Sequence, residues 1–139
     1  MADDDKTDLV EDLTEATCRR HLAAESVGRI ALVSDGRVDM FPVNYAMSDG
    51  AVVIRTRLGG ALASLGDRAD VVFEIDELDH RYHTGWSVVV HGVAERITDP
   101  AVVEQLEALD IQPWAGGSRP DWLRIEPTDL TGRRIRWSG

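Results

Sequence analysis

The sequence predicts a mainly β domain, built as an antiparallel Greek-key barrel of six to seven strands with two or three helices. Seven short strand-like runs occur along the chain, and tight turns join most of them. The longest run, Gly85 to Ile97, carries apolar residues on both of its faces. A strand buried on both faces is expected in the middle of a small barrel. Together these observations favour a barrel over a layered parallel sheet.

The chain is predicted to begin with a tail and a helix. A length of 139 residues corresponds to one domain. Residues 1–10 are acidic and nearly lack apolar side chains, so we expect a disordered acidic tail there and a single domain over residues 11–139. Leu13 to Glu25 is predicted to be a helix, because its apolar residues recur at helical spacing.

Three strands follow the helix and are joined by two tight turns. Both turns read Ser-Asp-Gly, at residues 34–36 and 48–50, and Asp-Gly between strand-like runs is a strong hairpin signal. Pro42 has no backbone N–H to donate, so its strand is expected at an edge or a bulge. The three strands are predicted at Gly28–Val33, Val38–Met47 and Ala51–Thr56.

The second half of the chain is predicted to combine four strands with two helices. A short helix is expected to open at about Gly59-Gly60. Asp99 and Pro100 are typical of the N-cap and the first position of a helix, which is predicted to run to Leu109. The strands are predicted at Ala69–Leu78, Gly85–Ile97, Trp122–Glu126 and Leu130–Trp137.

The segment from Arg55 to Gly60 is a candidate phosphate cradle. It places basic and hydroxyl side chains at a strand end, in Arg55-Thr56-Arg57, and follows them with Gly59-Gly60. Glycines let the backbone approach a ligand closely, and the N–H groups at a helix N-terminus attract anions. The segment therefore suits a ligand that carries an anionic group.

The cysteine and the histidines are weaker candidates. Cys18 and His21 lie one helical turn apart, but no third orienting group and no cause for a lowered thiol pKa is evident, so we interpret Cys18 as a packed thiol. His80 and His83 have a spacing seen in metal ligands, but a loop fixes no geometry for them. We interpret both as solvated and expect no metal. His91 is expected to be a packed or rim residue.

Charge and composition exclude several classes of partner. The net charge of -10 argues against sequence-independent nucleic-acid binding, which needs cations to neutralise phosphates. Arg133, Arg134 and Arg136 cluster in the last strand, but the abundant carboxylates can pair with them. No apolar run is long enough to span a bilayer, and no signal peptide is visible. We therefore expect no nucleic-acid and no membrane partner. The single cysteine fits a reducing compartment, so we expect a cytoplasmic protein.

Five segments of the chain carry a resemblance to a known family. They are Gly28–Ala31, Pro42–Tyr45, Ile54–Thr56, Gly85–Glu95 and Trp122–Pro127. In this order they resemble the pyridoxamine 5'-phosphate oxidase-like, FMN-binding split-barrel proteins, and within them the small stand-alone branch. The resemblance covers nearly the whole chain, from about Leu13 to Ile135.

The resemblance implies a six-stranded split barrel that forms a homodimer, with two cofactor sites across the dimer interface. It implies FMN in many members and a deazaflavin or haem in others. Two strand ends would lie along the flavin ring and ribityl chain, the turn after them would face the phosphate, and Trp86-Ser87 would approach the site. The cofactor-binding residues that it implies are Val43, Asn44, Ile54, Arg55, Thr56, Arg57, Gly60, Ala61, Trp86 and Ser87.

One departure from the family pattern bears on the cofactor. Related sequences usually place a Lys, which would pair with the flavin phosphate, where this chain has Gly60-Ala61. No basic residue lies between Arg57 and Arg68. Either Arg55 and Arg57 replace the missing Lys, or helix N–H groups hold the phosphate alone, or FMN binds weakly or not at all.

Two functions are compatible with these residues. The first is a flavin- or deazaflavin-dependent oxidoreductase of unknown substrate, in which the cofactor carries the hydride chemistry and no side chain is nominated as acid or base. The second is a dimeric barrel that holds a cofactor or haem without turnover, or that has lost its ligand and serves as a dimeric module. His80, His83 or His91 would be the candidate axial ligands of a haem. The retained Arg55-Thr56 and Trp86-Ser87 favour the first function, and the missing Lys favours the second.

Overall fold

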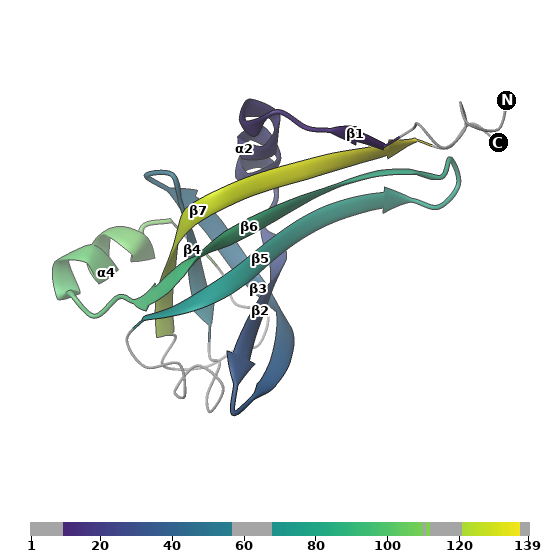
Figure 1. Ribbon diagram of the computed structural model, residues 1–139. Coiled ribbons are helices and arrows are strands. Elements are labelled where there is room, and N and C mark those ends of the chain that lie inside the picture. Colours follow the sequence, from purple (N-terminus) through teal and green to yellow (C-terminus); the bar gives the residue numbers. More distant parts are fainter. Residues whose placement is uncertain (1–9, 57–67, 110, 112–120, 137–139) are drawn as a thin grey trace, which may run out of the picture.

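The computed structural model describes residues 10–56, 68–109, 111 and 121–136 of the chain. Over these residues the chain forms seven strands and two helices (Figure 1). The short helix predicted to open at about Gly59-Gly60 would begin outside the described residues. The elements are β1 (Val10–Asp12), α2 (Glu15–Ala24), β2 (Val27–Ser34), β3 (Arg37–Ser48), β4 (Ala51–Thr56), β5 (Arg68–Asp79), β6 (Thr84–Arg96), α4 (Pro100–Glu107) and β7 (Asp121–Arg136).

Strands β2 to β7 close into an antiparallel barrel, which confirms the predicted fold class. The strand order is β7-β4-β3-β2-β5-β6, and β6 also pairs with β7 to complete the ring. The first half of β7 pairs with β4 and its second half with β1, while β6 runs along its other edge. Pro42 lies in the part of β3 that pairs only with β2 among the described strands, as expected for a residue without an N–H.

Both predicted hairpin turns are confirmed. Asp35 and Gly36 have φ values of 51° and 74°, and Asp49 and Gly50 have φ values of 50° and 77°. Two successive residues with positive φ form the turn whose twist matches antiparallel strands. Asp tolerates this conformation and glycine adopts it without strain, which is why the Asp-Gly pair predicts it.

The last strand corrects one prediction, because the two strands predicted on either side of Pro127 are a single strand, β7. The pairing of β6 with β7 shifts register between His91 and Gly92, which leaves Thr128 as the extra residue of a β-bulge. The Thr128 hydroxyl donates a hydrogen bond to the carbonyl of His91, at 3.1 Å. The bulge allows the strand to continue past a proline that looks like a break in the sequence.

Two further features differ from the prediction. Strand β1 was not predicted, and it pairs Glu11 with Arg134 at the edge of β7. The outer face of β6 is also less buried than predicted: Val88 and Val90 are fully buried, whereas Val89 is half-buried and His91 is exposed. A closed barrel has one apolar interior, and no described element covers the other face of this strand.

Helix α2 closes one end of the barrel. The Thr14 hydroxyl caps the helix by accepting a hydrogen bond from the N–H of Thr17, at 3.2 Å. Cys18 and Leu22 face inward and are buried in the main core. The Tyr45 hydroxyl donates to the Leu22 carbonyl at 2.7 Å and so ties the helix to β3. Burial raises the pKa of Tyr45 well above its ordinary value, which keeps this donor protonated.

Helix α4 covers a second, smaller apolar cluster on the outside of the barrel. Asp99 is its N-cap, as predicted, and accepts a hydrogen bond from the N–H of Ala101 at 3.0 Å. Leu106 from this helix packs with Val53 of β4 and Trp122 of β7. Helix α4 therefore covers one part of the outer face of the barrel.

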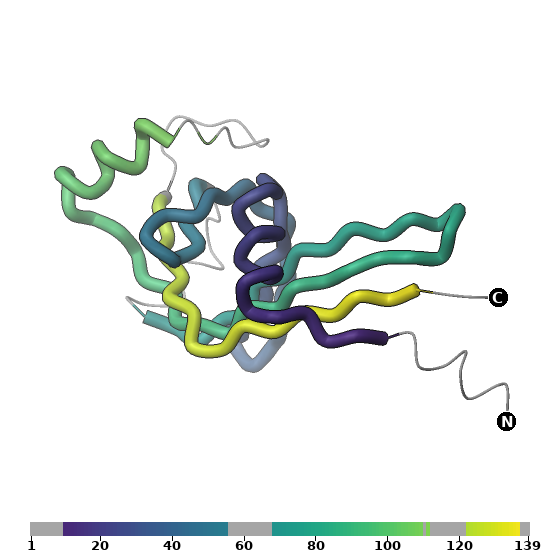
Figure 2. Tube along the Cα trace, turned by 90° about the horizontal axis from the view of Figure 1, so that it is seen from above, coloured from purple at the N-terminus to yellow at the C-terminus, as the bar shows by residue number. Residues whose placement is uncertain are grey.

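Beyond α2, β1 and the adjoining ends of β5, β6 and β7 extend away from the barrel as an arm (Figures 1 and 2). We define the arm as β1, residues 77–86 of β5, β6 and their turn, and residues 134–136 of β7. Strand β1 forms its outer edge.

In the described part of the chain, no helix combines the length and the apolar character that a membrane crossing requires.

Candidate functional site

Two of the predicted cofactor residues, Asn44 and Arg55, lie side by side on the outer face of the barrel. Strands β3 and β4 pair Tyr45 with Ile54, and both of these side chains are buried inside the barrel. Asn44 and Arg55 are the next residues along the two strands, so they share the opposite face. Both are half-buried. The structure brings these two residues together, and their role toward a cofactor stays a prediction.

Arg55 is held over the apolar cluster beneath α4. Its guanidinium carbon lies 5.3 Å from the centre of the Trp122 ring, within the range of a cation–π contact. Its Nη1 donates to the carbonyl of Ile111 at 3.3 Å. Its Nε is buried and has no hydrogen-bond partner among the described residues. Buried donors are rarely left unpaired, so the Nε of Arg55 marks a position where the described residues supply no acceptor.

Val43 and Ile54, also predicted to contact the cofactor, belong to the main core. Val43 is buried and Ile54 is fully buried, with both side chains inside the barrel. A ligand on the outer face would meet only their backbone. Because side chains alternate along a strand, a motif of consecutive residues places only every second side chain on one face.

Trp86 and Ser87 point to opposite faces of β6 for the same reason. Trp86 continues the inner face and packs against the main core, whereas Ser87 lies on the outer face. Ser87 is paired with Asp76 of β5 on one side and with Arg133 of β7 on the other. The structure therefore does not bring Trp86 to the face that carries Arg55.

Four of the predicted cofactor residues lie at or beyond the end of β4. Thr56 is the last residue of β4, and its backbone is paired with that of Asp121. Arg57, Gly60 and Ala61 lie outside the described residues. The candidate phosphate cradle is thus described only up to Thr56, and its role stays a prediction.

A charged cluster on the outer face was not anticipated from the sequence. Arg29 of β2 contacts Glu74 at 3.0 Å and Asp76 at 2.9 Å, both on β5. Burial, and then the hydrogen bond and charge of Asp76, raise the pKa of Glu74 to about 7. The cluster depends on the pairing of β2 with β5, two strands that are far apart in the sequence. No local sequence pattern therefore indicates the cluster.

The cysteine and the histidines form no described catalytic or metal site. Cys18 is fully buried, and burial raises the pKa of its thiol, which confirms the packed-thiol interpretation. His80 and His83 lie in the exposed turn at the tip of the arm, and His91 is exposed on the outer face of β6. Over the described ranges, no group of three or more metal-ligating side chains is present.

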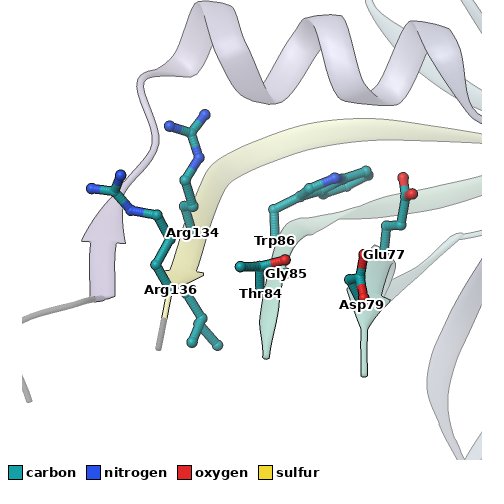
Figure 3. Close-up of a pocket in the computed structure, with 8 residues that line it drawn as sticks. Glu77, Asp79, Thr84, Gly85, Trp86, Arg134 and Arg136 are labelled. Carbon is teal, nitrogen blue, oxygen red and sulfur yellow. The ribbon is translucent and has the colours of Figure 1, made fainter. Parts of the chain in front are cut away.

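An open pocket of about 300 Å³ lies on the arm, on the face that carries Trp86 (Figure 3). Glu77 of β5 stands on one side of Trp86 and Arg134 of β7 on the other. The ring of His21, from α2, stacks on Trp86 with centroids 3.7 Å apart and planes 20° apart. The remaining lining residues are Asp79, Thr84, Gly85, Ile135 and Arg136.

Comparison with known proteins places the chain among relatives of the same fold. The family model for pyridoxamine 5'-phosphate oxidase matches residues 14–134. The uncharacterized protein Rv0080 of Mycobacterium tuberculosis is 37% identical over 131 residues, which cover 91% of this chain and 86% of that protein.

Two solved structures extend the comparison. A Corynebacterium glutamicum protein, provisionally described as a pyridoxamine 5'-phosphate oxidase, aligns with a TM-score of 0.81 and 33% identity, over 91% of this chain and 98% of that chain. The FAD binding protein from Mycobacterium smegmatis aligns with a TM-score of 0.74 and 32% identity, over 91% and 98% of the two chains. These matches confirm the split-barrel fold that the sequence predicts.

Proposed function

The chain belongs to the pyridoxamine 5'-phosphate oxidase family, and from this premise we propose that it binds a flavin nucleotide on the outer face of its barrel and serves as an oxidoreductase. The observation that carries the proposal is Arg55. Its guanidinium is fixed over Trp122 while its buried Nε has no partner among the described residues. A cation with an unused donor beside a candidate phosphate cradle fits an anionic ligand.

The residues on this face would hold and orient the cofactor. Arg55 would donate to a phosphate oxygen, and Asn44 beside it offers an amide that can donate or accept. When bound, a flavin supplies the hydride chemistry, so the protein needs to provide position and electrostatics rather than a dedicated acid or base. The substrate is proposed to be a small molecule that reaches the flavin from solvent.

The type of flavin is the finer part of the proposal. The sequence resemblance implies FMN, and the Mycobacterium smegmatis relative is an FAD binding protein. Both carry a phosphate that Arg55 would contact, and they differ by the adenylate half of FAD. We propose FMN or FAD as the cofactor, and the affinities of the two will show which of them the site prefers.

A second copy of the chain is proposed to complete the site. Val33, Val38 and Met40 lie on the outer face of β2 and β3 and are 60% to 73% exposed. An open pocket of about 380 Å³ lined partly by Val33 and Val38 continues this apolar surface toward His91. Exposed apolar surface of this kind marks association sites, and a homodimer would bury it. A cytoplasmic location is proposed from the lone cysteine.

The test is a titration of the cofactor-stripped protein with FMN, FAD, a deazaflavin and haem, followed by fluorescence and absorbance. We expect a Kd of about 1 µM or lower for FMN or FAD. Reduction of the bound flavin by a nicotinamide donor would support the oxidoreductase, and a bound flavin that no donor reduces would mark a non-catalytic carrier. Failure of both FMN and FAD to bind would reject the proposal.

A further inference from the structure

The pocket on the arm is built by two rows of side chains that cross three neighbouring strands. In the first row, Glu77 of β5 lies opposite Trp86 of β6, which lies opposite Arg134 of β7. The second row, one step closer to the tip, consists of Asp79, Thr84 and Arg136. One wall of the pocket is therefore acidic and the other basic, with an aromatic side chain between them (Figure 3).

The two charged residues nearest to Trp86 have no ion-pair partner among the described residues, although Glu11 of β1 lies opposite Arg134 in the strand pairing. Arg136, the residue of the basic wall nearer to the tip, forms an ion pair with Glu11 of β1 at 2.6 Å and so already has a partner. By contrast, Glu77 and Arg134 form no ion pair and no side-chain hydrogen bond with another described residue. Adjacent strands are about 4.8 Å apart, so the Cβ atoms of these two residues are about 10 Å apart. Trp86 stands between them and keeps them separate.

The aromatic side chain of the pocket is held in place before any ligand arrives. The His21 ring, from α2, stacks on Trp86, and Trp86 also packs against the main core. Burial, and then the charge of Arg134, lower the pKa of His21, which favours the neutral form of its ring. Preorganised groups lose little conformational freedom on binding, which favours recognition of a small ligand.

We propose that the arm pocket binds a small zwitterion, with its ammonium group at Glu77 and its carboxylate or phosphate group at Arg134. An anion alone would also face Glu77 and Asp79, and a cation alone would face Arg134, so a ligand with a single charge satisfies one wall and is repelled by the other. A volume of about 300 Å³ is at the lower end of the range for small-molecule pockets. This site is separate from the proposed flavin face and does not depend on flavin binding.

The probe for this site is ε-aminocaproate, an extended molecule with one ammonium and one carboxylate group. We would titrate the full-length chain and follow the indole N–H signal of Trp86 by NMR, assigned through the Trp86→Phe variant. We expect a Kd of about 1 mM or lower, and binding at least about tenfold weaker for caproate and for hexylamine, which carry only one of the two charges. Glycine, whose two charges lie too close together to reach both walls, is also expected to bind weakly.

Three variants connect the binding to the two walls. Arg134→Gln and Glu77→Gln are each expected to weaken ε-aminocaproate binding by about tenfold or more. Arg133→Gln is the matched control, because Arg133 is adjacent in sequence but lies on the opposite face of β7. The control is expected to bind as tightly as the unmodified chain.

Several outcomes would overturn the proposal. The first is that the indole N–H signal of Trp86 does not shift with ε-aminocaproate. The second is that caproate or hexylamine binds as tightly as ε-aminocaproate. The third is that Arg133→Gln weakens binding as much as Arg134→Gln does. Sedimentation of the same variants tests an alternative role for the pocket. If Arg134→Gln changes the oligomeric state while no probe binds, the acidic and basic walls serve contact between two copies of the chain, and the zwitterion site is rejected.

Discussion

The barrel and the arm share three strands, yet the same strand face has opposite chemistry in the two regions. Along the inner face of β6, Val88 and Val90 are fully buried in the barrel, whereas Thr84 and Trp86 line an open pocket on the arm. The difference follows from what covers the face. Where α2 and the facing strands enclose it, the face is apolar, and where the cover ends, charged and aromatic side chains replace the core. One continuous strand thus supplies both the stability of the barrel and an accessible surface.

The largest expected effect separates the two regions on a single strand. Phe73 of β5 is fully buried in the barrel, and Leu78 of the same strand is 58% exposed on the arm. We expect Phe73→Ala to lower the free energy of unfolding by about 3–5 kcal/mol, because it removes buried apolar surface and leaves a cavity. Leu78→Ala is expected to change it by less than about 0.5 kcal/mol. Urea unfolding of both variants measures this, and a similar loss for both would show that the arm is packed as tightly as the barrel.

A smaller effect is expected at the contact between α2 and the barrel. Tyr45→Phe removes the hydroxyl that donates to the Leu22 carbonyl and leaves a buried acceptor without this partner. We expect a loss of about 1–3 kcal/mol in the free energy of unfolding. Tyr82→Phe, in the exposed turn of the arm, is the matched control and should have no measurable effect. If Tyr45→Phe is as stable as the unmodified chain, the hydrogen bond does not anchor the helix.

The outer face of the barrel is expected to make stability depend on pH. The pKa of Glu74 is raised from 4.5 to about 7 in the folded chain. The folded state therefore binds this proton more tightly than the unfolded state, and the resulting stabilisation is present below about pH 4.5 and is lost as the pH rises through about 7. Glu74→Gln removes this titration. As the pH rises from 5 to 8, the free energy of unfolding of the variant should increase by on the order of 1 kcal/mol relative to that of the unmodified chain.

The control for that experiment is Glu104→Gln, a change on the exposed face of α4. Its effect on the free energy of unfolding should be the same at both pH values. If the difference between Glu74→Gln and the unmodified chain also stays constant from pH 5 to pH 8, the carboxyl of Glu74 does not titrate in that range.

The smallest expected effect lies on the arm. Glu11 and Arg136 are 47% and 57% exposed, so their ion pair is well solvated. A double-mutant cycle with Glu11→Gln and Arg136→Gln should give a coupling energy of about 0.2–1 kcal/mol, which falls when salt is raised to about 1 M. A coupling above about 2 kcal/mol that does not respond to salt would contradict the view of the arm as an open, solvated structure.

Local features of the fold were predictable from the sequence. The Asp-Gly turns at residues 34–36 and 48–50 depend on the conformational preferences of two adjacent residues, and the start of α4 depends on the Asp99 cap. The continuity of β7 was not predictable, because Pro127 is typical of a break and the bulge at Thr128 depends on a partner strand distant in sequence. The same limit applies to β1, whose short length gives no periodicity.

The candidate site was predictable only in part. Asn44 and Arg55 lie on neighbouring strands of a predicted hairpin, so their proximity follows from local pairing. The resemblance also grouped Trp86 with Arg55, but in the structure Trp86 lies on the inner face and on the arm. The cluster of Arg29 with Glu74 and the pocket around Trp86 depend on strand pairings between distant segments. Such contacts follow from the closure of the barrel and leave no signal in a single stretch of sequence.

The most direct test of the account is the flavin affinity of two arginine variants, one from each region. Arg55→Gln changes the barrel face and Arg134→Gln changes the arm pocket, with circular dichroism to verify that both variants are folded. We predict that Arg55→Gln weakens the binding of FMN or FAD by about ten- to a hundredfold, because it removes a charge-assisted hydrogen bond, and that Arg134→Gln stays within about twofold of the unmodified chain. Unchanged affinity in Arg55→Gln, or a larger loss in Arg134→Gln, would contradict the assignment of the flavin to the barrel face.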